Sequence, residues 1–156
     1  MERIVGIGEM AISNNIEDTI KTFALASCVG VVAYSPQKKV GGMLHFALPH
    51  PLVKQEPEVR SCYYASIGIP YFIHSIYKEY GCLKNELIIS LYGGASSIRN
   101  EDIFHVGEKN LETARSILNN MNIKFDDIET GRKVSRTIQL NISTGKVDIA
   151  YQKITI

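Results

Sequence analysis

Two strand-like segments joined by a tight turn constrain the fold of this chain more than any other part of its sequence. Residues 19–34, TIKTFALASCVGVVAY, and residues 40–48, VGGMLHFAL, are rich in the β-branched and small apolar residues typical of buried strands. Between them, SPQK at 35–38 places Pro36 at the second position of a type I turn, where its fixed φ is already suitable. The pattern predicts an antiparallel hairpin.

The expected register of this hairpin brings a thiol opposite an imidazole. If Tyr34 pairs with Lys39 across the turn, Cys28 lies opposite His45 on the same face of the ribbon. Opposed residues have Cβ atoms about 4.5–5.5 Å apart, which is close enough for a thiol and an imidazole to exchange a proton. Because a shift of one residue would separate the two side chains, the inference depends on the turn.

Strand alternation also sorts the neighbours of Cys28 by size. The cysteine face carries Ala24, Ala26, Gly30 and Val32, and the other face carries Phe23, Leu25, Val29 and Val31. Small neighbours would leave room for another molecule to approach a reactive thiol. They would equally accommodate a helix packed on the sheet, and free cysteine is among the residue types most often buried in cores. The geometry leaves both interpretations of Cys28 open, as a nucleophile and as a core residue.

The rest of the chain predicts two helices and further short strands. Residues 61–82 have helical apolar spacing, with Pro70 at a kink or in the first turn and Gly81 as the stop. Residues 106–122 form a second helical pattern, with Leu111, Ala114, Ile117 and Leu118 on one face. Strand-like segments occupy 3–8, 86–94, 123–129, 136–142 and 146–156, and the proline-rich segment 49–59 is expected to be a loop. These elements predict an α+β fold with a mixed sheet, as a single domain over residues 1–156.

Composition excludes several classes of function. The 156 residues are 45% apolar and 21% charged, and a net charge of +1 gives no basic face for nucleic acid or a membrane surface. The N-terminal segment MERIVGIGEM lacks the apolar run of a signal peptide, and no segment approaches membrane-spanning length, so we expect a cytoplasmic protein. The odd number and wide spacing of the three cysteines argue against a disulfide framework, and the four histidines lack metal-ligand spacing. We therefore expect no metal and no other cofactor.

Several motifs, taken in order, resemble the chemoreceptor glutamine deamidase family, CheD. They are TFALASCVGVVAYSPQKKVGGMLHFALP at 22–49, YYASIGIPYFI at 63–73, YGGA at 92–95, VGEKN at 106–110 and TGRKVSRTIQLNISTGKV at 130–147. The likeness covers nearly the whole chain. Its most specific part is Ser-Cys-Val followed by the histidine of G-x-M-x-H.

This resemblance implies a fold and an activity. The fold is an α/β sandwich with mixed sheet layers and two main helices, related to the deamidating domain of cytotoxic necrotising toxins. The activity is that of a cysteine hydrolase, which converts particular glutamines of methyl-accepting chemotaxis receptors to glutamate and releases ammonia. Members of the family can also hydrolyse receptor glutamate methyl esters, and they are bound by CheC-type phosphatases.

The resemblance also assigns roles to individual residues. It makes Cys28 the nucleophile, His45 the base and Thr22 the residue that orients the histidine, while backbone around Ala26 and Ser27 would hold the oxyanion. A paired histidine is expected to lower the pKa of the thiol. Thr22 would lie about 20 Å from Cys28 on a straight strand. Either the chain bends before residue 24, or the threonine reaches the imidazole from a neighbouring segment.

The chain departs from the family pattern at four places. Ala26 replaces a glycine, Lys109 replaces the arginine of a G-x-R-N element, Tyr64-Ala65-Ser66 lacks an acidic residue, and Gly131-Arg132 stands for paired glycines. None of these changes removes a catalytic group, but the last three affect positions that could recognise a receptor or partner. The alternative function is therefore a regulatory module that binds a CheC-type phosphatase with little or no catalysis. A cysteine protease is less favoured because the sequence outlines no known type of peptide-binding cleft.

Overall fold

A computed structural model of the chain describes residues 1–51, 61–96 and 104–154. Most of the expected loop at 49–59 and the last two residues of the expected strand at 146–156 lie outside these residues. The elements are β1 (Glu2–Ile4), β2 (Glu9–Ser13), β3 (Thr19–Leu25), β4 (Val29–Ser35), β5 (Val40–Phe46), η1 (Ser61–Tyr63), α1 (Ala65–Tyr80), η2 (Lys84–Glu86), β6 (Ile88–Gly93), α2 (Val106–Asn120), β7 (Phe125–Thr130), β8 (Val134–Asn141) and β9 (Val147–Lys153).

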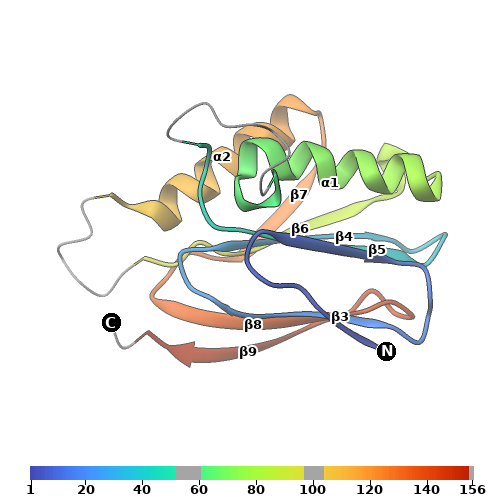
Figure 1. Ribbon diagram of the computed structural model, residues 1–156, viewed down its shortest axis with the longest axis horizontal. Coiled ribbons are helices and arrows are strands. Elements are labelled where there is room, and N and C mark those ends of the chain that lie inside the picture. Colours follow the sequence, from blue (N-terminus) through green and yellow to red (C-terminus); the bar gives the residue numbers. More distant parts are fainter. Residues whose placement is uncertain (52–60, 97–103, 155–156) are drawn as a thin grey trace.

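The strands form two sheets, and the two long helices form a third layer (Figure 1). One sheet has the order β2-β5-β4-β6-β7 and the other the order β1-β3-β8-β9. The pairs β1–β3 and β6–β7 are parallel, whereas the other pairs are antiparallel. The prediction of an α+β fold with mixed sheets and two main helices is confirmed.

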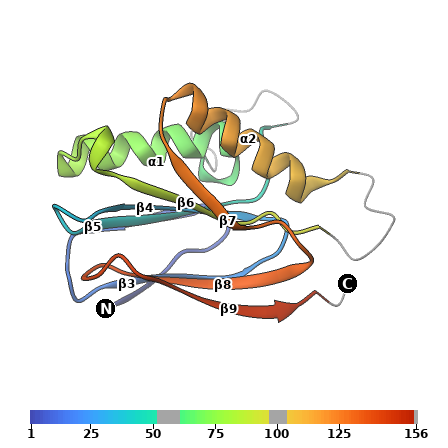
Figure 2. The same cartoon turned by 180° about the vertical axis from the view of Figure 1, so that it is seen from behind.

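The central strands β4 and β5 are buried along their whole length because both of their faces are covered (Figure 2). On the outer face, Val31 and Leu44 pack in one core with Ile69 and Phe72 of α1. On the inner face, Val32 of β4 and Met43 of β5 belong to a second core. The facing sheet contributes Ile20 of β3 and two residues of β8, Ile138 and Leu140. Both strands therefore carry apolar residues at successive positions, as expected for a sheet covered on both sides.

The first helix differs slightly from its predicted extent. A single turn of 3-10 helix precedes it, and Pro70 lies within α1, beyond its first turn. The helix ends as expected at Gly81, which adopts the left-handed conformation with φ of 66° and donates its N–H to the carbonyl of Tyr77.

The expected strand at 19–34 is wrong, because this segment forms two strands in different sheets. β3 ends at Leu25 and β4 begins at Val29, and residues 26–28 link the two layers. Near the end of β3, Ala24 has a φ of 54° and the register with β8 shifts, so the strand bends before the link. The crossing also places Leu25 in the inner core that Cys28 contacts, rather than on the opposite face. The apolar pattern concealed the break because both strands are buried.

The expected hairpin forms, but its register differs by one step on each strand. Ser35 pairs with Val40, so His45 lies opposite Gly30 instead of Cys28. The cause is Lys39, which adopts the left-handed conformation with φ of 52° and donates its N–H to the carbonyl of Ser35. The loop between the paired residues Ser35 and Val40 therefore has four residues, as in hairpin loops built around a type I turn, and two more than the expected register leaves between Ser35 and its partner.

Candidate functional site

The link between the two sheets, residues 26–28, is held by hydrogen bonds to all three of its carbonyl groups. The carbonyl of Ala26 accepts from the N–H of Ala95 at 2.7 Å, and that of Cys28 accepts from the N–H of Gly94 at 2.9 Å. The carbonyl of Ser27 accepts from Nδ2 of Asn110 at 2.9 Å. Within the described residues, no acceptor contacts the N–H groups of Ser27 and Cys28. The link therefore carries free amide donors beside the thiol.

Two glycines from the family-like motifs allow other backbone segments to approach this link. A Cβ atom at Gly93 would overlap the carbonyl oxygen of Cys28, and one at Gly107 would overlap the carbonyl oxygen of Ala95. Gly93 also has a φ of 99°, which L side chains rarely adopt. The segments YGGA and VGEKN thus place the end of β6 and the first turn of α2 close to the link that carries Cys28.

His45 is held from the opposite sheet by a threonine. The imidazole is 2% exposed, and its Nδ1 lies 2.7 Å from Oγ1 of Thr22 on β3. The same hydroxyl donates its proton to the carbonyl of Val5 at 2.7 Å. With that proton committed, Oγ1 accepts a hydrogen bond from Nδ1–H, so Nε2 carries the lone pair. Nε2 is buried and has no hydrogen-bond partner among the described residues.

Cys28 and His45 face the same space between the two sheets. Cys28 is half-buried and packs against the inner core, whereas His45 bonds to Thr22 across that space. His45 pairs with Gly30, the second residue of β4, whereas Cys28 lies in the link just before that strand. The register shifts by two in total, which leaves the paired residues of β4 and β5 on their expected faces. The predicted pairing of Cys28 with His45 is wrong, because Gly30 pairs with His45 and Cys28 lies outside β4.

Thr22 reaches the imidazole by the second of the two routes considered from the sequence. It does not approach along its own strand toward Cys28. It lies on β3 in the facing sheet, so the contact with His45 crosses from one layer to the other. Because the link at 26–28 crosses between the sheets, the consecutive strands β3 and β4 lie in opposite layers.

Burial moves both titrating groups toward their neutral forms. It lowers the pKa of His45 to about 4 and raises the pKa of the Cys28 thiol. The expectation that His45 lowers the thiol pKa is therefore wrong for this state of the protein, because no hydrogen bond joins Nε2 to the sulfur. At neutral pH the resting pair is a thiol and a neutral imidazole.

The low pKa of His45 predicts a loss of stability in acid. Between pH 6.5 and about 4 the unfolded chain binds a proton at this residue and the folded chain does not. The free energy of unfolding should therefore fall with decreasing pH, by up to about 3 kcal/mol from this group. Denaturant unfolding across this range measures the effect.

A matched pair of histidine variants separates this effect from general acid sensitivity. His45→Gln should lack this contribution, whereas His74→Gln, on the exposed face of α1, should retain it. Equal slopes of stability against pH in the wild type and His45→Gln would contradict the assignment.

Sequence reasoning missed one residue of the site, Asn110. This asparagine is fully buried, and its Nδ2 donates to the carbonyls of Ser27 and Ala47, both at 2.9 Å. It thereby connects the link at 26–28 to the segment that follows β5. The available signal was its spacing, because Asn110 precedes Ala114 by four residues and so places an amide on the apolar face of the helix.

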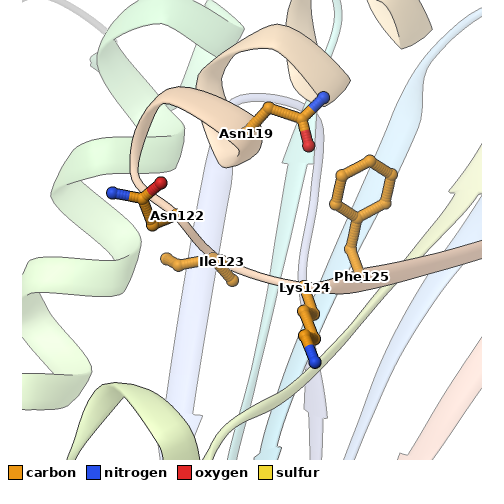
Figure 3. A pocket seen from close by; sticks show the side chains of 5 residues that line it. All are labelled: Asn119, Asn122, Ile123, Lys124 and Phe125. Atoms are coloured by element: carbon orange, nitrogen blue, oxygen red, sulfur yellow. The ribbon is translucent and has the colours of Figure 1, made fainter.

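The hollows elsewhere on the surface do not contain these groups. Figure 3 shows one at the end of α2, lined by Asn119, Asn122, Ile123, Lys124 and Phe125. It lies about 20 Å along the helix axis from the first turn of α2, which packs near the link.

In the described parts of the chain, no group of three or more His, Cys, Asp or Glu side chains could hold a metal ion. No helix in those parts combines the length and apolar character needed to cross a membrane.

Comparison with known sequences identifies one family. Residues 47–151 match the family model described as "CheD chemotactic sensory transduction". The chain is 37% identical over 145 residues to "Probable chemoreceptor glutamine deamidase CheD 1" of Syntrophus aciditrophicus, covering 92% of this chain and 90% of that one. It is 36% identical over 145 residues to "Probable chemoreceptor glutamine deamidase CheD" of Pyrococcus abyssi, covering 92% and 87%. The model match begins after Cys28 and His45, but alignments of this extent necessarily include both.

A solved structure shares the fold at low sequence identity. "Crystal structure of YlmD from Geobacillus stearothermophilus" superposes with a TM-score of 0.52 and 9% identity, over 78% of this chain and half of the YlmD chain. At this identity the likeness concerns the fold alone.

Proposed function

Because the chain belongs to the CheD family, we propose that it is a chemoreceptor glutamine deamidase, a protein-glutamine glutaminase that acts on methyl-accepting chemotaxis receptors. The reaction replaces the amide of a glutamine side chain by a carboxylate and releases ammonia. We propose that residues 1–156 act as one deamidase domain and that the protein works in the cytoplasm, on the cytoplasmic domains of its receptors.

The observation that carries the proposal is the protonation state set by Thr22. Its hydroxyl donates to the carbonyl of Val5 and accepts from Nδ1–H of His45, which leaves Nε2 as an unpaired base. A pKa of about 4 keeps this imidazole neutral at neutral pH, so it can accept a proton. Cys28 faces the same space and is partly open to solvent. These features support a base and a nucleophile better than two core residues.

In the first half-reaction, Nε2 of His45 takes the thiol proton as the sulfur of Cys28 attacks the glutamine carboxamide carbon. Catalytic hydrogen bonds are often long before substrate binds, so the thiol and Nε2 would come together in the complex. The free N–H groups of Ser27 and Cys28 would bind the oxyanion that develops on the carboxamide oxygen. The carbon–nitrogen bond then breaks, the protonated imidazole gives its proton to the leaving nitrogen, and ammonia departs from a thioester.

In the second half-reaction, neutral His45 takes a proton from a water molecule that attacks the thioester carbon. The carbon–sulfur bond breaks, the sulfur recovers a proton from the imidazolium, and glutamate is released. No metal or organic cofactor enters either step. A receptor glutamate methyl ester would follow the same path with methanol as the leaving group, so we also propose methylesterase activity.

Family membership further supports binding of a CheC-type phosphatase, which we propose as a partner. Phosphatase binding does not require catalysis. A regulatory module could bind the phosphatase even if its Cys28 thiol were unreactive. The observation that favours an enzyme is the neutral imidazole of His45, with Nδ1 held by Thr22 and Nε2 unpaired among the described residues.

The assay that tests the proposed function uses purified protein and receptor cytoplasmic domains. Peptide mass spectrometry should show glutamine converted to glutamate at particular sites, with an equal amount of ammonia released. Phosphatase binding without any conversion would instead support the regulatory module.

A further inference from the structure

We propose that Asn110 is a positioning residue that orients the oxyanion-binding N–H of Cys28, an inference that rests on the deamidase function proposed above. Asn110 lies in the second turn of α2 and is fully buried. Its Nδ2 donates to the carbonyl of Ser27 in the link and to the carbonyl of Ala47 beyond β5, each at 2.9 Å. One amide nitrogen thus connects the chain segments that carry the nucleophile and the base.

Because the peptide bond is planar, the hydrogen bond from Asn110 to the Ser27 carbonyl also fixes the direction of the Cys28 N–H. In a trans peptide, the carbonyl of one residue and the N–H of the next point in opposite directions. The described residues contain no cis peptide bonds. Because the Ser27 carbonyl points to Asn110 on α2, the Cys28 N–H points away from α2. The Ala26 carbonyl points to Ala95, so the Ser27 N–H points away from that segment in the same manner.

The same hydrogen bond also strengthens the donor. A hydrogen bond accepted by a carbonyl polarises its peptide group, which makes the N–H on the other side a better donor. Oxyanion stabilisation depends on donors that are fixed before the reaction, since they need no reorganisation as charge develops. Asn110 supplies both orientation and polarisation for the Cys28 N–H.

The cost of burying Asn110 argues against a purely structural role. Its Oδ1 is buried and has no hydrogen-bond partner among the described residues. Leaving such an atom unpaired is unfavourable, and a buried unpaired group calls for an explanation. The NH₂ group must face the two carbonyls, and holding them in place is the explanation that the geometry offers.

The test compares amide hydrolysis with alkylation of the same thiol in Asn110→Leu, which keeps the side-chain size and removes the donor. For receptor deamidation we expect kcat to fall about 10- to 100-fold, as for a small misplacement of catalytic groups, with KM unchanged. The rate of Cys28 alkylation by iodoacetamide should not fall, because displacement at a saturated carbon forms no oxyanion. A residue that only held the fold would lower both rates together.

Two further variants keep the test decisive. Leu118→Ala removes a fully buried side chain from the same helix without touching the link, and it should lower stability while kcat stays at the wild-type value. If Asn110→Leu does not fold, Asn110→Ser replaces it in the test, with the same loss of kcat expected.

A wild-type kcat in a folded Asn110 variant, or equal losses of hydrolysis and alkylation, would overturn the inference alone. Absence of deamidation by the wild-type protein would overturn the proposed function, and the inference with it.

Discussion

Replacing Cys28 by alanine is expected to abolish receptor deamidation, with a loss on the order of 10⁴-fold or more, as when other enzymes lose their nucleophile. The sulfur is the atom that forms the thioester, and no other described cysteine lies in the link. Because Cys28 is half-buried at the edge of the inner core, the change to alanine should leave the fold intact. Ammonia release and receptor peptide masses measure the activity, and thermal unfolding checks the fold.

Cys82→Ala is the matched control for this substitution. Cys82 is 3% exposed and lies in the outer core with residues of α1, so its loss removes a buried thiol without touching the site. Its activity should remain close to wild type. Cys28→Ser should also be nearly inactive, because a neutral hydroxyl is a weaker nucleophile than a thiol. A folded Cys28→Ala protein that still converts glutamine to glutamate would exclude the mechanism.

Replacing His45 by glutamine is expected to lower kcat by about 10²–10⁴-fold, the range that general acid–base catalysis contributes. Glutamine retains polar atoms that could hydrogen-bond to Thr22 but cannot take a proton from the thiol. The measured quantity is kcat at neutral pH, where the imidazole of the wild type is neutral. The loss should affect both amide and methyl ester substrates, because both half-reactions use the same base.

Thr22→Val provides the graded comparison for the base. It retains the imidazole but removes the hydroxyl that accepts from Nδ1–H, so the ring would lose its fixed tautomer. Its kcat should lie between those of the wild type and His45→Gln. If Thr22→Val were as active as the wild type, Thr22 would have no part in orienting the base.

The candidate site was predictable from sequence to a limited degree. The turn signal at 35–38 and the strand patterns predicted the hairpin of β4 and β5, and the structure contains it. The pairing itself was missed because Lys39 enters the left-handed conformation after the turn. Alternation has a period of two, so it reports the face of a residue and is insensitive to a register change of two.

The catalytic roles of Cys28, His45 and Thr22, suggested by the family resemblance, stay predictions. The structure adds contacts that give them a physical basis, above all the hydrogen bonds from Thr22 to Val5 and His45. It also reverses one expectation, since burial raises the thiol pKa where pairing with histidine was expected to lower it. Burial is a property of the folded molecule and cannot be obtained from the spacing of two residues along a strand.

The sequence by itself determined the local elements: a hairpin around Pro36, two amphipathic helices and a series of apolar strands. These follow from short-range preferences of turns, periodicity and strand-forming residues, which neighbouring positions express directly. Only the tertiary structure decided that residues 26–28 cross between layers, that Thr22 meets His45 from the facing sheet, and that Asn110 holds the link. Each of these contacts joins residues whose separation in the chain carries no periodic signal, so only the packing of the layers brings them together.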